Sequence, residues 1–335
     1  MKKKTSLKDI AKEAGVSIAT VSYVLSKQEN SGVSQEVSDR IKEIAKRLNY
    51  RPNQIAKSLQ SGKSQTIGLI VADISNPFFA QIARIVEDEA KKYGYTVIFG
   101  SSDEKATKSH DLIKFLLNRQ VDGFIITPTE GSESQIELLK EQNIPFVLID
   151  RYFPNIETNY VAIDNYQAAF DATKKLMDNG KKRIGMIAYS TELYHMKERI
   201  KGHKDALGDG VYDTSLLQEV AFDKIVENMP KAIENLVKGN EPVDAIFFAT
   251  NTLGVIGLKY LDELKLQVPD DVAVIVFDES EVFHFFYCPL TYVKQPLSDL
   301  AKMAVTVLLN HIKDSNAKTD KVKLNAKLVI GNSSN

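Results

Sequence analysis

Carboxylate, arginine and phenylalanine side chains recur directly after short apolar runs of this sequence. Asp150-Arg151 follows the run FVLI, Asp278 follows VAVIVF, and a polar stretch from Asp73 to Phe79 follows TIGLIVA. Carboxylates accept hydrogen bonds from hydroxyl groups, guanidinium groups donate in a fixed geometry, and phenylalanine rings cover the C–H face of a ring. The combination is typical of a site for a neutral polyhydroxylated molecule such as a sugar.

The elements that would position these side chains follow from the alternation of apolar and amphipathic stretches after Thr66. Predicted strands cover residues 66–72, 95–101, 122–127, 146–150, 183–188, 244–249 and 272–277. Predicted helices cover residues 77–93, 104–118, 132–142, 165–179, 195–207, 223–238 and 251–265. Buried strands between helices indicate parallel sheets, which bind ligands beyond the carboxyl ends of their strands. We expect two α/β lobes with the site at these ends.

Residues 7–25 predict two short helices around a turn at Gly15. The first helix runs to about Glu13, and Ser17 caps a second helix that ends near Leu25. A small core could form between them from Leu7, Ile10, Ala11, Val16, Val21, Val24 and Leu25. This is the pattern of a helix-turn-helix, whose second helix reads the major groove of DNA. Ordinary packing of two amphipathic helices is the alternative.

Two further helices are predicted before the first lobe, over residues 34–48 and 53–59. Pro52 can open the second of these, and Ser61-Gly62 can end it. A helix this short is unstable alone in water and needs a partner to form.

Charge is distributed unevenly along the chain. Residues 1–63 contain 13 Lys and Arg against 6 Asp and Glu, whereas all 335 residues contain 43 against 44. The remaining residues are therefore acidic. A basic head on an acidic body suits a head that neutralises DNA phosphates and a body that does not contact nucleic acid.

Composition argues against several other classes of protein. The single Cys288 excludes an internal disulfide and a cysteine cluster for zinc, and it is more typical of packing than of a nucleophile. The sequence contains no G-x-S-x-G, P-loop or metal-ligand spacing, so we expect no enzyme, metal or cofactor. Without an apolar signal region or a run of about 18 apolar residues, a cytoplasmic protein with no membrane partner is expected.

The whole chain resembles the lactose-repressor/galactose-repressor (LacI/GalR) family of transcription regulators, from Ser6 to about Gly331. The resemblance rests on LKDIAKEAGVSIATVSYVL, LNYRPNQIAKSL, SNPFF, VLIDR, RIGMI, FFATN, VPDDVAVIVFD and CPLTYVKQP. It implies an all-α helix-turn-helix head on an α/β two-lobed core like that of periplasmic sugar-binding proteins. The implied domains are a head (1–50), a hinge (51–64) and a ligand-binding and dimerisation core (65–335). Within the core, the N-lobe takes about 65–164 and 296–323, and the C-lobe about 165–292 and 324–335.

The resemblance also implies which residues contact DNA. On the second helix of the head, these are Ser17, Ile18, Ala19, Thr20, Ser22 and Tyr23. On the hinge helix they are Asn53, Ala56 and Leu59, with Leu59 inserting into the minor groove and bending the duplex. Ordinary helix packing is the alternative for Leu59. Many members of the family carry Arg where this chain has Tyr23. The bidentate contact between an arginine and a guanine is therefore absent at this position.

For the effector, the resemblance implies eleven contact residues: Asn76, Phe78, Phe79, Asp150, Arg151, His195, Arg199, Phe222, Asn251, Asp278 and Gln295. The alternative for Arg199, Asn251 and Asp278 is a helix cap or a salt bridge between the lobes. The alternative role for Phe79 and His195 is packing. For His195, a surface position without contact to the effector is a second alternative. Two further departures from the family, Thr252 in place of Asp and Val276 in place of Gly, could change which ligand fits.

The implied mechanism is a two-state switch on double-stranded, palindromic operator DNA. A homodimer, with a tetramer left open, would place two heads on adjacent half-sites and pair two hinge helices. An effector that closes the cleft would change the spacing of the hinges. Our hypothesis is a sugar or sugar derivative that releases a repressor of carbohydrate-utilisation genes. The alternative is a nucleobase or other small metabolite that acts as co-repressor. A secreted sugar-binding protein would need a signal peptide and would lack the basic head.

Overall fold

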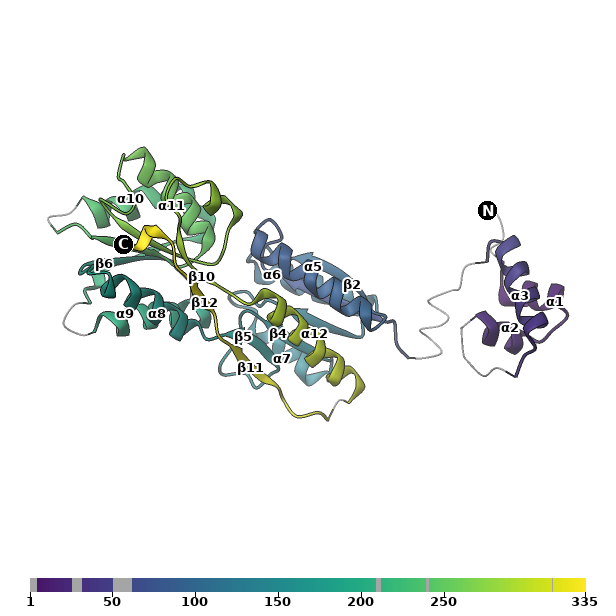
Figure 1. Ribbon diagram of the computed structural model, residues 1–335. Helices are drawn as coiled ribbons and strands as arrows, with labels where there is room; N and C mark the ends of the chain where they lie inside the picture. The colour runs from purple at the N-terminus through teal and green to yellow at the C-terminus, as the bar shows by residue number, and fades with distance from the viewer. Residues whose placement is uncertain (1–4, 26–31, 51–61, 209–211, 239–240, 315) are drawn as a thin grey trace. The chain divides into compact units, whose positions relative to one another are not determined.

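The computed structural model describes residues 5–25, 32–50, 62–208, 212–238, 241–314 and 316–335 (Figure 1). The chain divides into a unit of residues 1–64 and a unit of residues 65–335. Within the described ranges, no helix is long and apolar enough to cross a membrane.

In the first unit, the described residues form three helices: α1 (Leu7–Ala14), α2 (Ile18–Leu25) and α3 (Gln35–Arg47). Ser6 caps α1 in a capping box with Asp9, and Gly15 ends it at a φ of 69°. The Ser17 hydroxyl accepts a hydrogen bond from the backbone N–H of Thr20 at 3.0 Å, as expected of the cap of α2. The predicted apolar residues pack with those of α3 in one core. The helix-turn-helix prediction is therefore confirmed.

Two sheets form the second unit, each with six strands among the described residues. The first sheet, with the order β11-β5-β4-β3-β1-β2, is entirely parallel. Its strands are β1 (Thr66–Val71), β2 (Thr96–Ser101), β3 (Gly123–Ile126), β4 (Phe146–Ile149), β5 (Tyr160–Ile163) and β11 (Lys321–Leu324). The second sheet has the order β12-β10-β9-β8-β6-β7 and is parallel except for the β10–β12 pair. Its strands are β6 (Ile184–Tyr189), β7 (Leu217–Val220), β8 (Ala245–Phe248), β9 (Ala273–Phe277), β10 (Thr291–Lys294) and β12 (Lys327–Val329).

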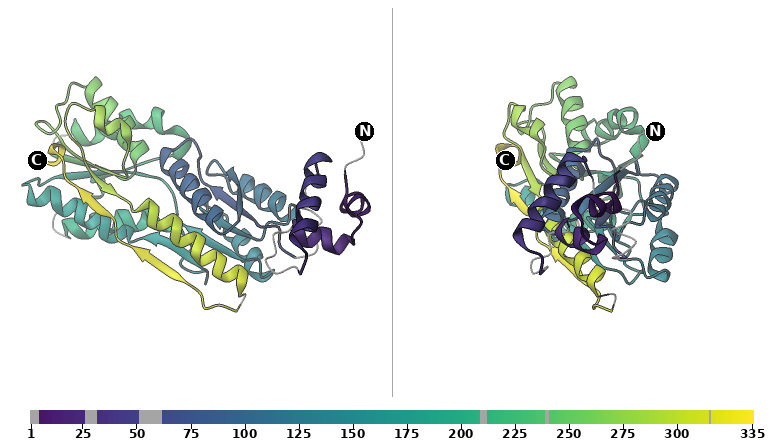
Figure 2. Two further views of the ribbon diagram at one scale, coloured as in Figure 1. Left: turned by 45° about the vertical axis from the view of Figure 1, so that its right-hand side comes forward. Right: turned by 90° about the vertical axis from the view of Figure 1, so that its right-hand side faces the viewer.

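Helices flank each sheet and define two lobes. The first lobe contains α5 (Pro77–Lys92), α6 (Ala106–Asn118), α7 (Glu133–Glu141) and α12 (Leu297–Lys313). The second contains α8 (Asn165–Asp178), α9 (Tyr194–Leu207), α10 (Ile225–Val237) and α11 (Asn251–Glu263). Helices α5 and α12 lie side by side (Figures 1 and 2). The chain crosses between the lobes after β5, after β10 and after β11.

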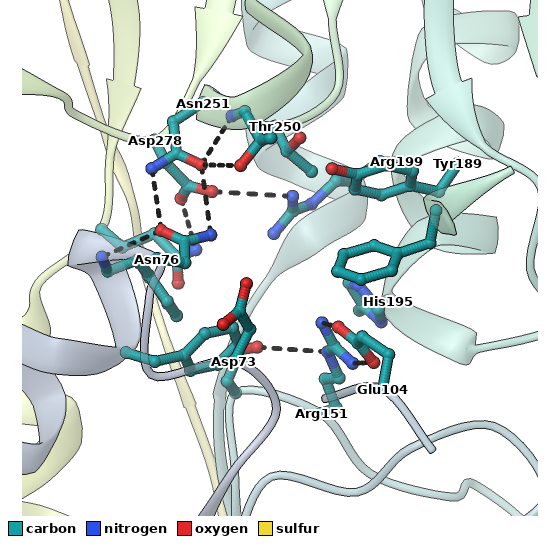
Figure 3. Close-up of a pocket in the computed structure, with 16 residues that line it drawn as sticks. Asp73, Asn76, Glu104, Arg151, Tyr189, His195, Arg199, Thr250, Asn251 and Asp278 are labelled. Atoms are coloured by element: carbon teal, nitrogen blue, oxygen red, sulfur yellow. Dashed lines mark hydrogen bonds and ion pairs between the residues drawn. The ribbon is translucent and has the colours of Figure 1, made fainter. Parts of the chain in front are cut away.

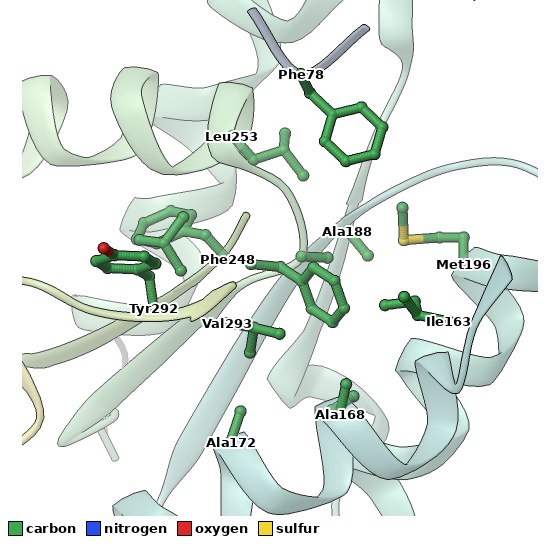
Figure 4. Packing of buried hydrophobic residues seen from close by; sticks show 14 of the residues in the cluster. Phe78, Ile163, Ala168, Ala172, Ala188, Met196, Phe248, Leu253, Tyr292 and Val293 are labelled. Atoms are coloured by element: carbon green, nitrogen blue, oxygen red, sulfur yellow. The ribbon is translucent and has the colours of Figure 1, made fainter. Parts of the chain in front are cut away.

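Small residues let the helices of the second lobe approach closely. Ala168 and Ala172 of α8 face the sheet beside Phe248 and Val293 (Figure 4). At Gly202 of α9, an added Cβ would lie only 2.2 Å from the backbone oxygen of Tyr166 on α8. Helix α9, which carries two of the expected effector residues, is thereby held against α8.

All seven predicted strands and all seven predicted helices of the lobes are present within two residues of their expected ends. The stretch 223–238 differs slightly, because a short 3-10 helix at Phe222–Lys224 precedes α10. Helix α12 and five strands were not predicted from the sequence. Three of these strands, β7, β11 and β12, lie at sheet edges and mix polar with apolar residues, so they lack a long continuous apolar run. The predicted helix 53–59 lies outside the described residues.

Candidate functional site

A cavity with about 450 Å³ of empty space, part of it open to solvent, lies between the two lobes (Figure 3). The structure brings all eleven expected effector residues to its wall. The wall also contains five residues that were not among them: Asp73, Glu104, Tyr189, Thr250 and Thr252.

The two lobes present one aspartate each from the same kind of turn. Asp150 follows β4 and donates its backbone N–H to Val161 of β5, at 2.9 Å. Asp278 follows β9 and donates its backbone N–H to Val293 of β10, also at 2.9 Å. Their φ angles are 69° and 73°, in the left-handed region that residues with a Cβ rarely adopt. Pairing with the next strand therefore holds each buried carboxylate at the carboxyl edge of its sheet.

Arg199 is held inside the second lobe by an amide, a carbonyl and a ring. Its Nε donates to Asn165 Oδ1 at 2.8 Å, and its Nη1 donates to the backbone oxygen of Ala249 at 2.7 Å. The guanidinium lies 3.5 Å from the centre of the Phe277 ring, and Nη1 is 4.0 Å from Asp278 Oδ2. Arg199 therefore pairs with an aspartate of its own lobe, which is not the salt bridge between the lobes that was considered as its alternative role.

Arg151 belongs to the first lobe and is paired more tightly. Its two terminal nitrogens each donate to one carboxylate oxygen of Glu104, both at 2.7 Å. Its Nε lies 3.5 Å from Asp150 Oδ2, and the guanidinium is 5.7 Å from the centre of the Phe79 ring. The arginines of the two lobes thus enter the cavity with different partners.

Burial shifts the protonation of the groups around the cavity. It raises the pKa of Asp150 to about 6, although Arg151 and Arg199 oppose the rise. It also raises the pKa of Asp278, against the effect of Arg199. The pKa of His195 falls well below its ordinary value because burial and the two arginines disfavour the imidazolium. The imidazole is therefore neutral at neutral pH.

Several buried polar atoms of the wall have no hydrogen-bond partner among the described residues. They include Arg151 Nε, His195 Nδ1 and Gln295 Oε1. The Gln295 amide nitrogen, in contrast, donates to Asp278 Oδ1 at 2.7 Å. Because buried polar groups in proteins are nearly always paired, these atoms are positioned for a bound molecule that donates and accepts hydrogen bonds.

Amide and hydroxyl groups connect the lobes beside the cavity. Asn251 Nδ2 donates to Asn76 Oδ1 at 3.2 Å, and Thr191 donates to Glu130 at 2.6 Å. Asn76 also caps α5, whereas the cap of α11 is Thr250 rather than Asn251. Asn251 therefore bridges the lobes through its amide, and the cap expected as its alternative role belongs to its neighbour.

Aromatic rings cover parts of the wall. Phe78 and Phe79 meet edge to face with ring centres 5.0 Å apart, and both belong to the hydrophobic core. Phe79 thus combines the two roles considered for it, core packing and a place in the wall. Phe222 lines the cavity from the second lobe, with its ring centre 5.4 Å from that of Tyr189.

The expected DNA-contacting residues of α2 lie on its open side. Ser17, Ile18, Ala19 and Tyr23 are exposed, and Thr20 and Ser22 are partly exposed. The same helix buries Val21 and Val24 in the core of the unit. The hinge residues Asn53, Ala56 and Leu59 lie outside the described residues.

Comparison with known proteins places both units in one family. Residues 6–53 match "Bacterial regulatory proteins, lacI family", and residues 64–331 match "Periplasmic binding proteins and sugar binding domain of LacI family". The catabolite control protein A of Priestia megaterium is 34% identical over 322 residues, which cover 94% of this chain and 95% of that protein. The ribose operon repressor of Halalkalibacterium halodurans is 33% identical, with 97% and 96% covered.

A solved structure, that of the transcriptional regulator CelR in complex with cellobiose, has the same architecture. Its TM-score to this chain is 0.73 at 26% identity, with 98% of this chain and 100% of the other covered. Together with the family matches, this extends the likeness over the head and both lobes. The chain therefore belongs to the LacI family: it is a DNA-binding transcription regulator with an effector domain like the periplasmic binding proteins, and not an enzyme.

Proposed function

We propose that this protein represses carbohydrate-utilisation genes and that a sugar or sugar derivative releases it from its operator. The observation that carries the proposal is the chemistry of the cavity wall. Buried carboxylates, arginines and a neutral histidine lie beside phenylalanine rings, and several polar atoms there lack a hydrogen-bond partner among the described residues. Hydroxyl groups both donate and accept, so a polyhydroxylated ring satisfies such a wall.

Two of the relatives support a sugar as the effector. One is a ribose operon repressor by name, and the other is a regulator solved in complex with cellobiose. Their identities to this chain are 33% and 26%, so neither of these sugars is assigned to it.

In the proposed mechanism, the effector bridges the lobes. It contacts Asp150 and Arg151 on one side and Arg199 and Asp278 on the other, and thereby favours one arrangement of the lobes. A ligand shifts such an equilibrium only by its differential affinity for the two states. The changed arrangement alters the hinge segment 51–64, where Asn53, Ala56 and Leu59 are the proposed DNA contacts.

A homodimer on a palindromic operator completes the proposal. Strand β2 is an edge of its sheet and exposes Ile98 and Phe99. The second lobe exposes Val282, Phe285 and Tyr287 around a 3-10 helix, with Phe285 89% exposed. Apolar side chains at a sheet edge and on a loop are typical of surfaces that a second copy covers.

A gel-shift titration with operator DNA tests the proposal. Sugars that stabilise the protein against heat are added to the protein–DNA complex, and the effector is expected to weaken DNA binding. Asp278→Asn is expected to abolish this response, because it removes the buried negative charge and replaces one of the two acceptor oxygens by a donor, while DNA binding without sugar remains. Asp262→Asn, an exposed change on α11, is the matched control. A nucleobase that tightens DNA binding, or the absence of any response to sugars, would refute the proposal.

A further inference from the structure

Glu104 is fixed in the cavity wall by the backbone of its own turn. It lies between β2 and α6, and its φ of 56° and that of Asp103, 51°, are both left-handed. The backbone N–H of Glu104 donates to Ala72 at the end of β1, at 3.1 Å, and that of Ser102 donates to Val71 at 2.9 Å. Two adjacent residues rarely adopt this conformation without such support. The position of the carboxylate is therefore set by the sheet rather than by a flexible surface turn.

Glu104 occupies one of the two edges at which Arg151 could bind an acid, and the Asp150 carboxylate lies beside the other. A guanidinium group binds a carboxylate or phosphate through two parallel N–H groups on one edge. The edge with both terminal nitrogens pairs with Glu104 at 2.7 Å (Figure 3). On the other edge, Nε lies 3.5 Å from Asp150 Oδ2, so a ligand carboxylate that approached this edge would meet a negative charge. The N–H groups that remain can donate singly, which suits a hydroxyl group.

Arg199 offers no replacement for this two-point contact. Its Nε donates to Asn165 and its Nη1 to Ala249, so each of its edges has one nitrogen already engaged. Among the residues that the structure describes, the wall contains the carboxylates of Asp73, Glu104, Asp150 and Asp278 but only two guanidinium groups. An anionic ligand would meet an excess of negative charge.

We propose that Glu104 is a specificity-determining residue that restricts the effector to uncharged sugars and excludes sugar acids and sugar phosphates. The inference rests on the proposed function, since it specifies which sugars the same cavity accepts. Glu104 acts through Arg151, whose charge it neutralises and whose terminal nitrogens it engages.

The test compares matched neutral and acidic sugars on the full-length protein. Glucose is paired with glucuronate and glucose 6-phosphate, ribose with ribose 5-phosphate, and cellobiose with cellobionate. Thermal unfolding identifies the sugars that bind, and calorimetry gives their affinities. The wild-type protein is expected to bind a neutral member and to reject its acidic counterpart. Glu104→Gln is expected to raise the affinity for that acid at least about tenfold, because it frees the guanidinium. The affinity for the neutral sugar should change less than about threefold, since the amide still accepts one hydrogen bond.

Two control variants distinguish the effect of a carboxylate that lines the cavity from the effect of a carboxylate in the same turn that does not. Asp103→Asn removes a carboxylate from the same turn, but Asp103 pairs with Lys108 and Ser101 and does not line the cavity. It should leave the selectivity unchanged. Glu104→Asp keeps the charge and should still reject acids. Unfolding midpoints measured without sugar report whether each variant folds. If Glu104→Gln does not fold, the preference of the wild-type protein for neutral over acidic sugars alone tests the inference.

The possible failures are distinguishable. If the wild-type protein binds an acidic sugar as well as the neutral one, or if folded Glu104→Gln binds acids no better than wild type, the inference about Glu104 is overturned and the sugar effector stands. If no sugar of the panel stabilises the wild-type protein, the proposed function is overturned together with the inference.

Discussion

Replacing Asp150 by asparagine is expected to stabilise the protein at neutral pH and to weaken effector binding. Burial raises the pKa of this carboxyl from 3.8 to about 6 in the folded protein. Each pKa unit corresponds to about 1.4 kcal/mol, so ionised Asp150 lowers the free energy of unfolding by about 3 kcal/mol at neutral pH. Asparagine has nearly the same shape and carries no charge, so the variant avoids this cost.

The pH dependence gives the sign of the effect. Because the pKa is higher in the folded than in the unfolded protein, the folded state binds more protons between these two values. The wild-type protein therefore gains stability from this group as the pH falls through about 6. Near pH 5 the free energy of unfolding of the wild-type protein should rise by about 1.4 kcal/mol relative to that of Asp150→Asn. This is roughly half of the difference between the two proteins at neutral pH.

Urea unfolding followed by circular dichroism measures both quantities. The free energies of unfolding of wild type and Asp150→Asn are compared near pH 7.5 and near pH 5. Asp111→Asn, an exposed change on α6, serves as control and should alter neither value appreciably. The reasoning is refuted if Asp150→Asn is less stable than wild type at neutral pH, or if the difference between them does not shrink on acidification.

Two further substitutions test the packing of the effector domain and the head. Gly202→Ala should lower the free energy of unfolding by at least about 2 kcal/mol, because the new Cβ would lie 2.2 Å from the backbone oxygen of Tyr166; urea unfolding measures the loss. An unchanged unfolding midpoint would contradict the close approach of α8 and α9. Ser17→Ala removes the cap that accepts from Thr20 and should destabilise α2 by about 1 kcal/mol. Operator affinity in a gel shift should then fall up to about fivefold, whereas Ser17→Asp, which can still cap, would retain the folded helix.

The positions of most wall residues could be predicted because they depend on local sequence and one general rule. Asp150 and Asp278 come directly after buried apolar strands, and parallel sheets bring the carboxyl ends of such strands to one edge. Periodicity alone thus predicted where to look. Which of these side chains share one cavity followed only from the resemblance to the family.

Glu104 could not be predicted in this way, because its conformation depends on contacts far along the chain. An acidic residue before an amphipathic stretch is typical of the first turn of a helix, and the predicted helix accordingly began at 104. In the structure α6 begins at Ala106, since Glu104 is left-handed and its backbone N–H donates to Ala72, directly after β1. Tyr189 was missed for a simpler reason, because β6 continues one residue beyond the predicted end at 188.

The residues that form the cavity lower the stability of the folded protein, and a bound effector can offset this destabilisation. Asp150 and Asp278 are left-handed, buried and raised in pKa, and several polar atoms of the wall are unpaired among the described residues. Each of these features lowers the stability of the empty site. A sugar that supplies the missing hydrogen bonds from both lobes at once removes several of these costs together. The sugar therefore stabilises the arrangement in which the two lobes face each other across it. An arrangement in which the lobes are separated gains no stability from the sugar. That difference is what a ligand needs in order to shift the protein between two states.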